Sequence, residues 1–211
     1  AGMRQVTITS KDVSASGDPP AFMGDPDTAW LLSLATLCNE AFMEHEGAQS
    51  LEGSSTEKAL IRLAERAGIN STSFRGDHPI LEIRHRTEQH PFMVTIHRWT
   101  KDRELAVMKG SPHEVEERCA FFHRDGQCLP LGEAERSRIE AENFRMSGTG
   151  LRVLGVAYQW DPQQNVEAFH SETGRLVWAG LFGLSDPLRR GAREVVQGLH
   201  RAGIRTAVIT G

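Results

Sequence analysis

The sequence lacks the features that mark several large classes of protein. It contains only three cysteines in 211 residues, and no two of them have the spacing of a zinc site. No stretch approaches the roughly 18 apolar residues that a membrane helix needs, and no signal peptide is visible. The net charge of -4 comes without a run of lysine or arginine, which argues against nucleic acid as a partner. We therefore expect a globular protein with reduced thiols, as in the cytosol.

Two familiar types of ligand motif are also missing. No phosphate loop of the Walker type is present, and residues 148–153 (GTGLRV) only begin like a dinucleotide-binding fingerprint, because Val153 replaces its third glycine. His85, His90 and His97 are close in sequence, but their spacing fits neither one helix face nor one strand face. We interpret them as surface histidines and predict no metal site.

The sequence does contain a regular pattern of helices and strands. Hydrophobic residues make up 39% of the chain, which is enough for a substantial core. Apolar residues at helical spacing predict a helix within residues 28–42, which Asp27 or Thr28 would cap. Ser54 with Glu57 three residues later forms a capping-box pattern at the start of a second helix, which Gly68 ends.

The middle of the chain changes to short alternating segments, which predict antiparallel strands. The expected strands cover residues 80–86, 91–99, 104–109 and 151–159, with a hairpin turn at 100–103. The other expected elements are a helix over 112–122, a hairpin tip at Asp125-Gly126, a helix over 132–148 and a loop over 160–174.

The end of the chain has the pattern of a strand, a helix and a second strand. Residues 175–184 and 204–211 are nearly continuous apolar runs, and residues 185–203 between them have helical periodicity. Strands that are apolar throughout are typical of a buried parallel sheet, so we predict a βαβ unit. One such unit cannot cover both faces of its sheet, and we expect the chain to be part of a longer protein.

Lys109 and Gly110 stand at the end of an apolar strand, just before a predicted helix. A lysine is a mobile point charge suited to a phosphate or a purine edge, and a glycine lets a flat base approach the backbone. The same pair is also explained by a strand end and a turn. Capping alone accounts for Glu57, a strand flank for Arg152, and a helix start for Asp186-Pro187.

The order of five segments adds a family resemblance. Together they resemble the cytoplasmic region of the P-type ATPases, the ion pumps that form an aspartyl-phosphate. The segments are LCNEAF at 37–42, STEKAL at 55–60, MKGSPHEV at 108–115, GLRVLGVAY at 150–158, and the stretch from 180 to 211 that contains SDPLRR and ends in ITG. The last segment is the most specific of the five.

The resemblance implies an α+β fold, in which helices flank a twisted antiparallel sheet. Residues 11–175 would form the nucleotide-binding domain, while residues 1–10 and 176–211 would be fragments of the phosphorylation domain. The second fragment would supply a terminal βαβ unit of a haloacid-dehalogenase-like α/β domain. The protein would then be a cytoplasmic part of an integral membrane pump, with the remaining phosphorylation, actuator and transmembrane domains as its partners.

The resemblance also implies roles for single residues, with ATP as ligand and Mg²⁺ bound as Mg-ATP. In the ATP site, Glu57 would lie near the adenine amino group, His85 would take the place of a stacking phenylalanine, Lys109 and Gly110 would border the adenine, and Arg152 would reach the phosphates. Asp186 and Arg189 would belong to the hinge, and Thr210 and Gly211 would begin the motif that holds phosphate and magnesium. With Lys109 directed at the ligand, Lys109→Ala should weaken ATP binding without unfolding the domain.

The chain departs from the family pattern at several positions. His85, His90, His113 and Leu188 stand where the family has phenylalanine, lysine, glutamate and proline, and the aspartate that is phosphorylated is missing. The chain alone should therefore bind nucleotide without hydrolysing it, as part of a calcium- or magnesium-type pump. The alternatives are a haloacid-dehalogenase-type phosphatase with a large cap domain, and a domain that has lost nucleotide binding.

Overall fold

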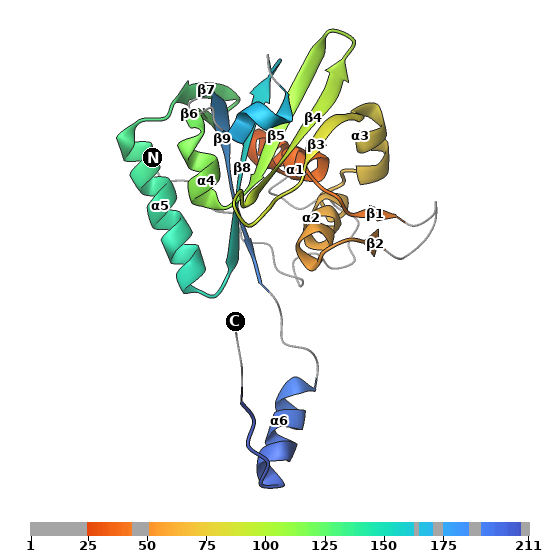
Figure 1. Ribbon diagram of the computed structural model, residues 1–211, viewed down its shortest axis with the longest axis vertical. Helices are drawn as coiled ribbons and strands as arrows, with labels where there is room; N and C mark the ends of the chain where they lie inside the picture. The colour runs from red at the N-terminus through yellow and green to blue at the C-terminus, as the bar shows by residue number, and fades with distance from the viewer. Residues whose placement is uncertain (1–24, 44–50, 163–164, 171–174, 186–190, 208–211) are drawn as a thin grey trace.

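The computed structural model describes residues 25–43, 51–162, 165–170, 175–185 and 191–207. In this part of the chain a seven-stranded sheet lies between two layers of helices (Figure 1). Residues 1–10, which were expected to belong to the phosphorylation domain, lie outside the described residues. So do the four expected hinge and phosphate-motif residues, which are Asp186, Arg189, Thr210 and Gly211.

The main sheet is almost entirely antiparallel, as the alternating segments predicted. Its strands are β3 (Ile80–Arg84), β4 (Phe92–Thr100), β5 (Arg103–Gly110), β6 (Cys119–Arg124), β7 (Gln127–Pro130), β8 (Arg152–Trp160) and β9 (Leu176–Leu184). They lie in the order β3-β4-β5-β8-β9-β6-β7, and only the β6–β9 pair is parallel. A separate two-stranded sheet joins β1 (Phe42–Met43) to β2 (Leu51–Glu52).

Helices cover both faces of the sheet because its central strands carry apolar residues on both sides. On β5, for example, Leu105 and Val107 face one apolar cluster, and Ala106 and Met108 face the other. The first cluster includes residues of α1 (Pro26–Leu37), α2 (Ser55–Arg66) and α3 (Ser71–Asp77). The second includes residues of α4 (Pro112–Glu117), α5 (Glu133–Gly148) and the 3-10 helix η2 (Val166–His170), which lies in the expected loop.

The apolar run at 175–184 has a different place from the one expected. Its strand β9 lies within the seven-stranded sheet, antiparallel to β8 and parallel to β6. The prediction that this run begins a βαβ unit of a separate parallel sheet is therefore wrong. The run is apolar because both faces of β9 are covered, with Val177 and Phe182 in one cluster and Leu176 and Trp178 in the other.

Two expected helices have different limits in the structure. The helix beginning at Pro112 ends at Glu117, and the following residues form β6, which turns into β7 through Asp125 (φ 50°) and Gly126 (φ 74°). Strand pairing on both sides of β6 outweighs the helical pattern of its sequence. The helix α1 is capped by Asp25, whose carboxylate accepts a hydrogen bond from the Thr28 amide, rather than by Asp27 or Thr28.

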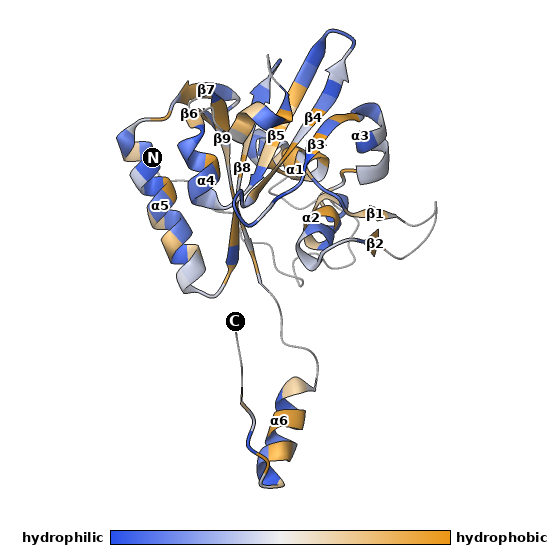
Figure 2. Ribbon diagram, in the orientation of Figure 1, coloured by the Kyte–Doolittle hydropathy of each residue, from blue (hydrophilic) through white to orange (hydrophobic). Residues whose placement is uncertain are grey.

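The last described helix, α6 (Ala192–Arg201), occupies the middle of the helical segment expected over 185–203. Its apolar residues Val195 and Val196 are exposed, and Figure 2 shows an apolar side along this helix. Residues 204–207 have no regular secondary structure, and residues 208–211 of the second expected strand lie outside the described ranges. None of the described helices combines the length and the apolar character that a bilayer crossing requires.

The three cysteines differ sharply in accessibility, which leads to a test of the fold. Cys38 and Cys119 are buried, and burial raises the pKa of the Cys38 thiol to about 11 and that of Cys119 further, whereas Cys128 is exposed on β7. We expect a thiol reagent at pH 8 to label Cys128 alone in the folded chain, because the thiolate is the reactive form. Denaturant should expose all three thiols, and rapid labelling of Cys38 or Cys119 without denaturant would contradict the core described here.

Candidate functional site

The candidate site surrounds the first turn of α2. The hydroxyl of Ser54 accepts a hydrogen bond from the Glu57 amide at 3.2 Å, which is the helix cap that the sequence predicted. The Glu57 side chain extends across to β5, where its two carboxylate oxygens lie 2.9 and 3.0 Å from Nζ of Lys109. Glu57 therefore joins α2 to the central sheet, in addition to its place in the first turn of the helix.

Lys109 is buried, with only 4% of its surface exposed. It lies on the face of β5 that carries Leu105 and Val107, under α1 and α2. Its ammonium donates to both oxygens of Glu57 and to the carbonyl of Cys38, which uses all three of its N–H groups. The expectation that this side chain is directed at the ligand rather than into the core is wrong. The reason for expecting Lys109→Ala to leave the domain folded is therefore lost as well.

The backbone after α1 completes the surroundings of Glu57. We call residues 38–41 the connecting segment, because they contact α2, α3 and β5. The Glu40 amide donates to Oε2 of Glu57 at 3.2 Å, and the buried amide side chain of Asn39 donates to the backbone carbonyl of Glu57 at 3.2 Å. Sequence reasoning missed Asn39 and Glu40 as site residues, although both lie in the segment LCNEAF that carried part of the family resemblance.

Arg75 of α3 holds the connecting segment from the other side. Its guanidinium donates to the carbonyls of Asn39 at 2.8 Å and Ala41 at 2.5 Å. Burial lowers the pKa of Arg75, an effect that the nearby carboxylate of Glu57 opposes. No local pattern in the sequence marks Arg75, because its partners lie 34 and 36 residues away.

Two other predicted residues lie at the edge of the same region. His85 follows β3, and its Nδ1 lies 2.8 Å from Oε1 of Glu40, with both side chains exposed. Arg152 begins β8 and donates to the hydroxyl of Thr56, the residue before Glu57, at 3.3 Å. The structure thus places Lys109 and Arg152 against the first turn of α2, and His85 beside Glu40 of the connecting segment.

Gly110 is adjacent to Lys109, but its need for glycine comes from the protein itself. A Cβ at this position would lie 2.4 Å from the carbonyl oxygen of Pro91 and 2.5 Å from Cα of Phe92. Backbone atoms cannot yield as a flexible side chain can, so the close approach of β4 excludes any larger residue. Packing between β4 and β5 is therefore a sufficient reason for glycine, and a contact with a bound base stays a prediction.

This arrangement combines a fixed carboxylate with a nearby cation. Glu57 retains some exposure, with 14% of its side chain accessible, and its carboxylate has acceptor positions beyond those used by Lys109 and Glu40. The exposed guanidinium of Arg152 offers donors suited to an anion. A ligand with an amine at one end and phosphates at the other fits these groups.

Comparison with known proteins identifies the family. The model of the P-type ATPase cytoplasmic domain N matches residues 27–191, which include all seven strands of the main sheet and all of the site just described. The chain belongs to this family.

Several relatives of this N domain are named as calcium- or cation-transporting ATPases. It is 30% identical over 206 residues to the calcium-transporting ATPase type 2C member 1 of Bos taurus, a match that covers 95% of this chain and 20% of the relative. It is 33% identical over 184 residues to the cation-transporting ATPase pma1 of Synechocystis, covering 83% and 19% respectively. A calcium-transporting ATPase of Listeria monocytogenes is 29% identical over 187 residues, covering 86% of the chain and 20% of that pump. The chain thus spans about a fifth of the length of these relatives.

Two of the family departures lie on the surface of the N domain. The ring of His90 is 5.9 Å from that of Phe92 in an edge-on arrangement, and the His90 amide donates to the Thr87 hydroxyl. His113 of α4 has its Nε2 3.3 Å from a carboxylate oxygen of Glu117, one turn further along the helix. Each of these two histidines thus has a local partner.

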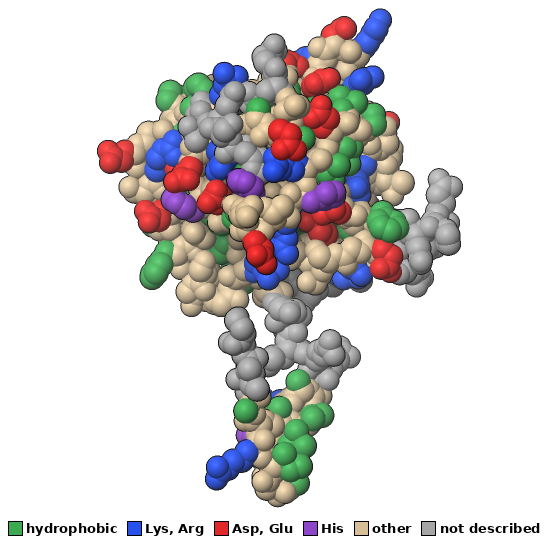
Figure 3. Space-filling view, viewed as in Figure 1, with side chains coloured by type: hydrophobic (Ala, Val, Ile, Leu, Met, Phe, Trp, Pro, Cys, Tyr) green, Lys and Arg blue, Asp and Glu red, His purple; other side chains and the backbone are tan. Residues whose placement is uncertain are grey.

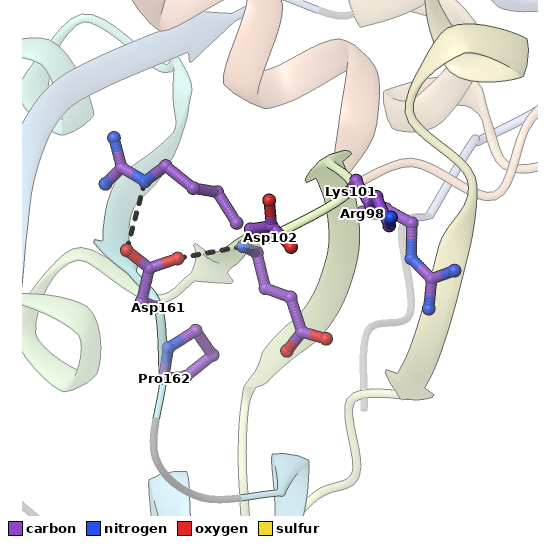
Figure 4. Close-up of a pocket in the computed structure, with 7 residues that line it drawn as sticks. Arg98, Lys101, Asp102, Asp161 and Pro162 are labelled. Carbon is purple, nitrogen blue, oxygen red and sulfur yellow. Dashed lines mark hydrogen bonds and ion pairs between the residues drawn. The ribbon is translucent and has the colours of Figure 1, made fainter.

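A second region of interest is a hollow at the turn between β4 and β5, at the end of β5 opposite to Lys109. It does not resemble a ligand site. Its volume is about 280 Å³, and its lining residues are Arg98, Lys101, Asp102, Arg103, Glu104, Asp161 and Pro162 (Figure 4). The carboxylate of Asp161 accepts from Nε of Arg103 at 3.1 Å and from the Glu104 amide at 2.9 Å. The charges of the acidic and basic side chains in the hollow are thus balanced by one another. Acidic and basic side chains are also interspersed over the face of the domain shown in Figure 3.

Proposed function

We propose that this chain binds ATP at the first turn of α2 and presents its γ-phosphate to the aspartate that a P-type pump phosphorylates. That aspartate lies outside this chain. The observation that supports this best is the position of the Glu57 carboxylate, held by Lys109 and the Glu40 amide, with Arg152 beside the same turn. These groups come from separate parts of the chain and meet at one partly exposed place.

The base would be recognised through Glu57. Adenine carries an exocyclic amine, and a carboxylate oxygen accepts the hydrogen bonds that this amine donates. Lys109 holds the carboxylate in place, because its ammonium donates to both oxygens of Glu57 and to the Cys38 carbonyl. His85 and Gly110 would border the ring, His85 through its exposed imidazole.

The phosphates would extend towards Arg152. Its guanidinium can pair with phosphate oxygens in a bidentate manner. Magnesium would enter as Mg-ATP, since Mg²⁺ in such sites is bound largely by phosphate oxygens and water. Transfer of the phosphoryl group then depends on positioning and on neutralising charge, which the neighbouring domain completes.

The parent protein would be an ion-translocating ATPase, and this chain a cytoplasmic domain of it. Its partners would be the phosphorylation, actuator and transmembrane domains of the same polypeptide. Segments 1–10 and 185–211 would connect to the phosphorylation domain, with Asp186 and Arg189 at the hinge and Thr210 and Gly211 in the phosphate motif. Two of the relatives cited above are named as calcium-transporting, which favours a calcium-type pump.

A titration of the chain with Mg-ATP, followed by amide chemical shifts, tests the site. We expect a dissociation constant of about 0.1–1 mM, or roughly -4 to -5.5 kcal/mol. The shifted amides should include those of Glu57, His85, Lys109, Gly110 and Arg152. Glu57→Gln should weaken binding by about tenfold, because a hydrogen bond to a charged group is lost, whereas Glu133→Gln on α5 should leave it unchanged.

Failure of this titration would point to one of the alternatives. The absence of any shift at millimolar ATP would indicate a domain that has lost nucleotide binding. Shifts that occur only far from α2 would contradict the site while leaving the family assignment intact.

A further inference from the structure

We propose that Arg75 determines base specificity by positioning the carboxylate of Glu57 through the connecting segment, residues 38–41. This inference rests on the proposed ATP site and adds to it a residue that would not touch the nucleotide. Arg75 belongs to α3, whereas Glu57 belongs to α2. Its effect on Glu57 would therefore pass through the connecting segment, which contacts both residues.

The first step is the hold of Arg75 on the connecting segment. Two nitrogens of one planar guanidinium donate to two carbonyls of the segment, Asn39 at 2.8 Å and Ala41 at 2.5 Å. This geometry fixes the direction of the backbone as well as its distance, since the two donors cannot move independently. The side chain of Asn39 adds an internal brace by accepting from the Ala41 amide at 2.8 Å.

The second step leads from the connecting segment to Glu57. The segment supplies the Glu40 amide to Oε2 of Glu57, and the Cys38 carbonyl to the same ammonium of Lys109 that binds Glu57. Both partners of the carboxylate therefore depend on where this segment lies. A shift of residues 38–41 would remove the Glu40 amide from Glu57 and would loosen the position of the Lys109 ammonium.

The third step is the chemistry of the base. A carboxylate in a fixed orientation accepts from the amine of adenine but repels the carbonyl oxygen that hypoxanthine and guanine carry at the same ring position. A carboxylate free to rotate can turn away from that oxygen and would discriminate less. The position of the Glu57 carboxylate then sets the preference for ATP over inosine triphosphate (ITP), whose base is hypoxanthine. Arg75 influences this preference because it holds the segment that positions Glu57.

The test compares the affinities of the chain for Mg-ATP and Mg-ITP. We expect the wild-type chain to prefer ATP, and Arg75→Gln to narrow the ratio of the two dissociation constants by about fivefold, as expected when a directed hydrogen bond is lost. Arg75→Lys should recover part of the preference for ATP, because lysine keeps a cationic donor. Arg98→Gln on β4 is the matched control and should leave the ratio of the two dissociation constants unchanged. An unaltered ratio in Arg75→Gln, with ATP still bound, would overturn this inference and leave the proposed function standing.

Hydrogen exchange provides a readout that needs no nucleotide. The amides of Glu40 and Ala41, which donate to Glu57 and Asn39, should exchange faster in Arg75→Gln, while that of Val107 in the core should keep its protection. Unchanged exchange at Glu40 would show that Arg75 does not hold the segment, and would also overturn the inference. If the wild-type chain bound neither nucleotide, the proposed function would fail, and base specificity with it.

Discussion

Replacing Lys109 with methionine is expected to lower the free energy of unfolding by about 3 kcal/mol. Methionine fills a similar volume but leaves the Glu57 carboxylate and the Cys38 carbonyl without their shared donor. Removing one partner of a buried pair costs about 3–5 kcal/mol. We expect the lower end of that range, because Glu57 keeps 14% of its side chain exposed to water. Urea unfolding at pH 7, followed by circular dichroism, measures the change.

The double variant Lys109→Met with Glu57→Gln is the matched control. Removing the second charge relieves the unpaired carboxylate, so this variant should recover a large part of the stability lost by Lys109→Met. Lys101→Met, on the exposed hairpin between β4 and β5, should have little effect. A Lys109→Met variant as stable as the wild type would show that the buried ion pair does not contribute as described.

Lowering the pH from 7.5 to 4.5 is expected to remove about 2–3 kcal/mol of stability through His97 alone. His97 is fully buried on β4, and this burial lowers its pKa to about 4. Nδ1 of the ring donates to the carbonyl of His78, so the neutral ring accepts from the hydroxyl of Thr95 at Nε2. Burial is the largest cause of this lowered pKa; the hydrogen bond to the His78 carbonyl opposes it, and the charges of Arg75 and His78 act in the same direction as burial.

The direction of this effect follows from the difference between the folded and unfolded chains. Above pH 7 the ring is neutral in both states and contributes nothing to the pH dependence. Between about pH 6.5 and pH 4 the unfolded chain takes up a proton that the folded chain excludes, so stability falls as the pH falls. Below the folded pKa the loss is complete.

His97→Gln should remove this part of the pH dependence, since glutamine can donate and accept but does not titrate in this range. The wild-type and variant chains should therefore differ by about 2–3 kcal/mol in their change of unfolding free energy between pH 7.5 and 4.5. His113→Gln, an exposed histidine on α4, should behave like the wild type. Equal pH profiles for His97→Gln and the wild type would contradict the burial of a neutral ring.

Local patterns were sufficient wherever neighbouring residues decide the structure. The alternation over residues 80–109 predicted the β3–β4–β5 meander, and Asp125-Gly126 predicted the β6–β7 turn. Ser54 was correctly predicted to cap α2. In each case hydrogen bonds within a few residues, or the turn between adjacent strands, fix the outcome.

Patterns failed where an element can pair in more than one way. The apolar run that forms β9 fits a parallel sheet as well as a mixed sheet covered on both faces, and only its partners β6 and β8 distinguish the two. The segment from Cys119 to Arg124 likewise became a strand because two strands flank it. Partner choice is a property of the whole chain, so no window of the sequence contains it.

The sequence by itself determined the family, the antiparallel strands and the candidates Glu57, His85, Lys109 and Arg152. Only the tertiary structure showed that Lys109 is buried against Glu57, and that Asn39, Glu40 and Arg75 organise the backbone around that pair. The reason is physical. A side chain's type is local, but its burial and its partners depend on segments 17 to 71 residues apart that meet only when the chain folds.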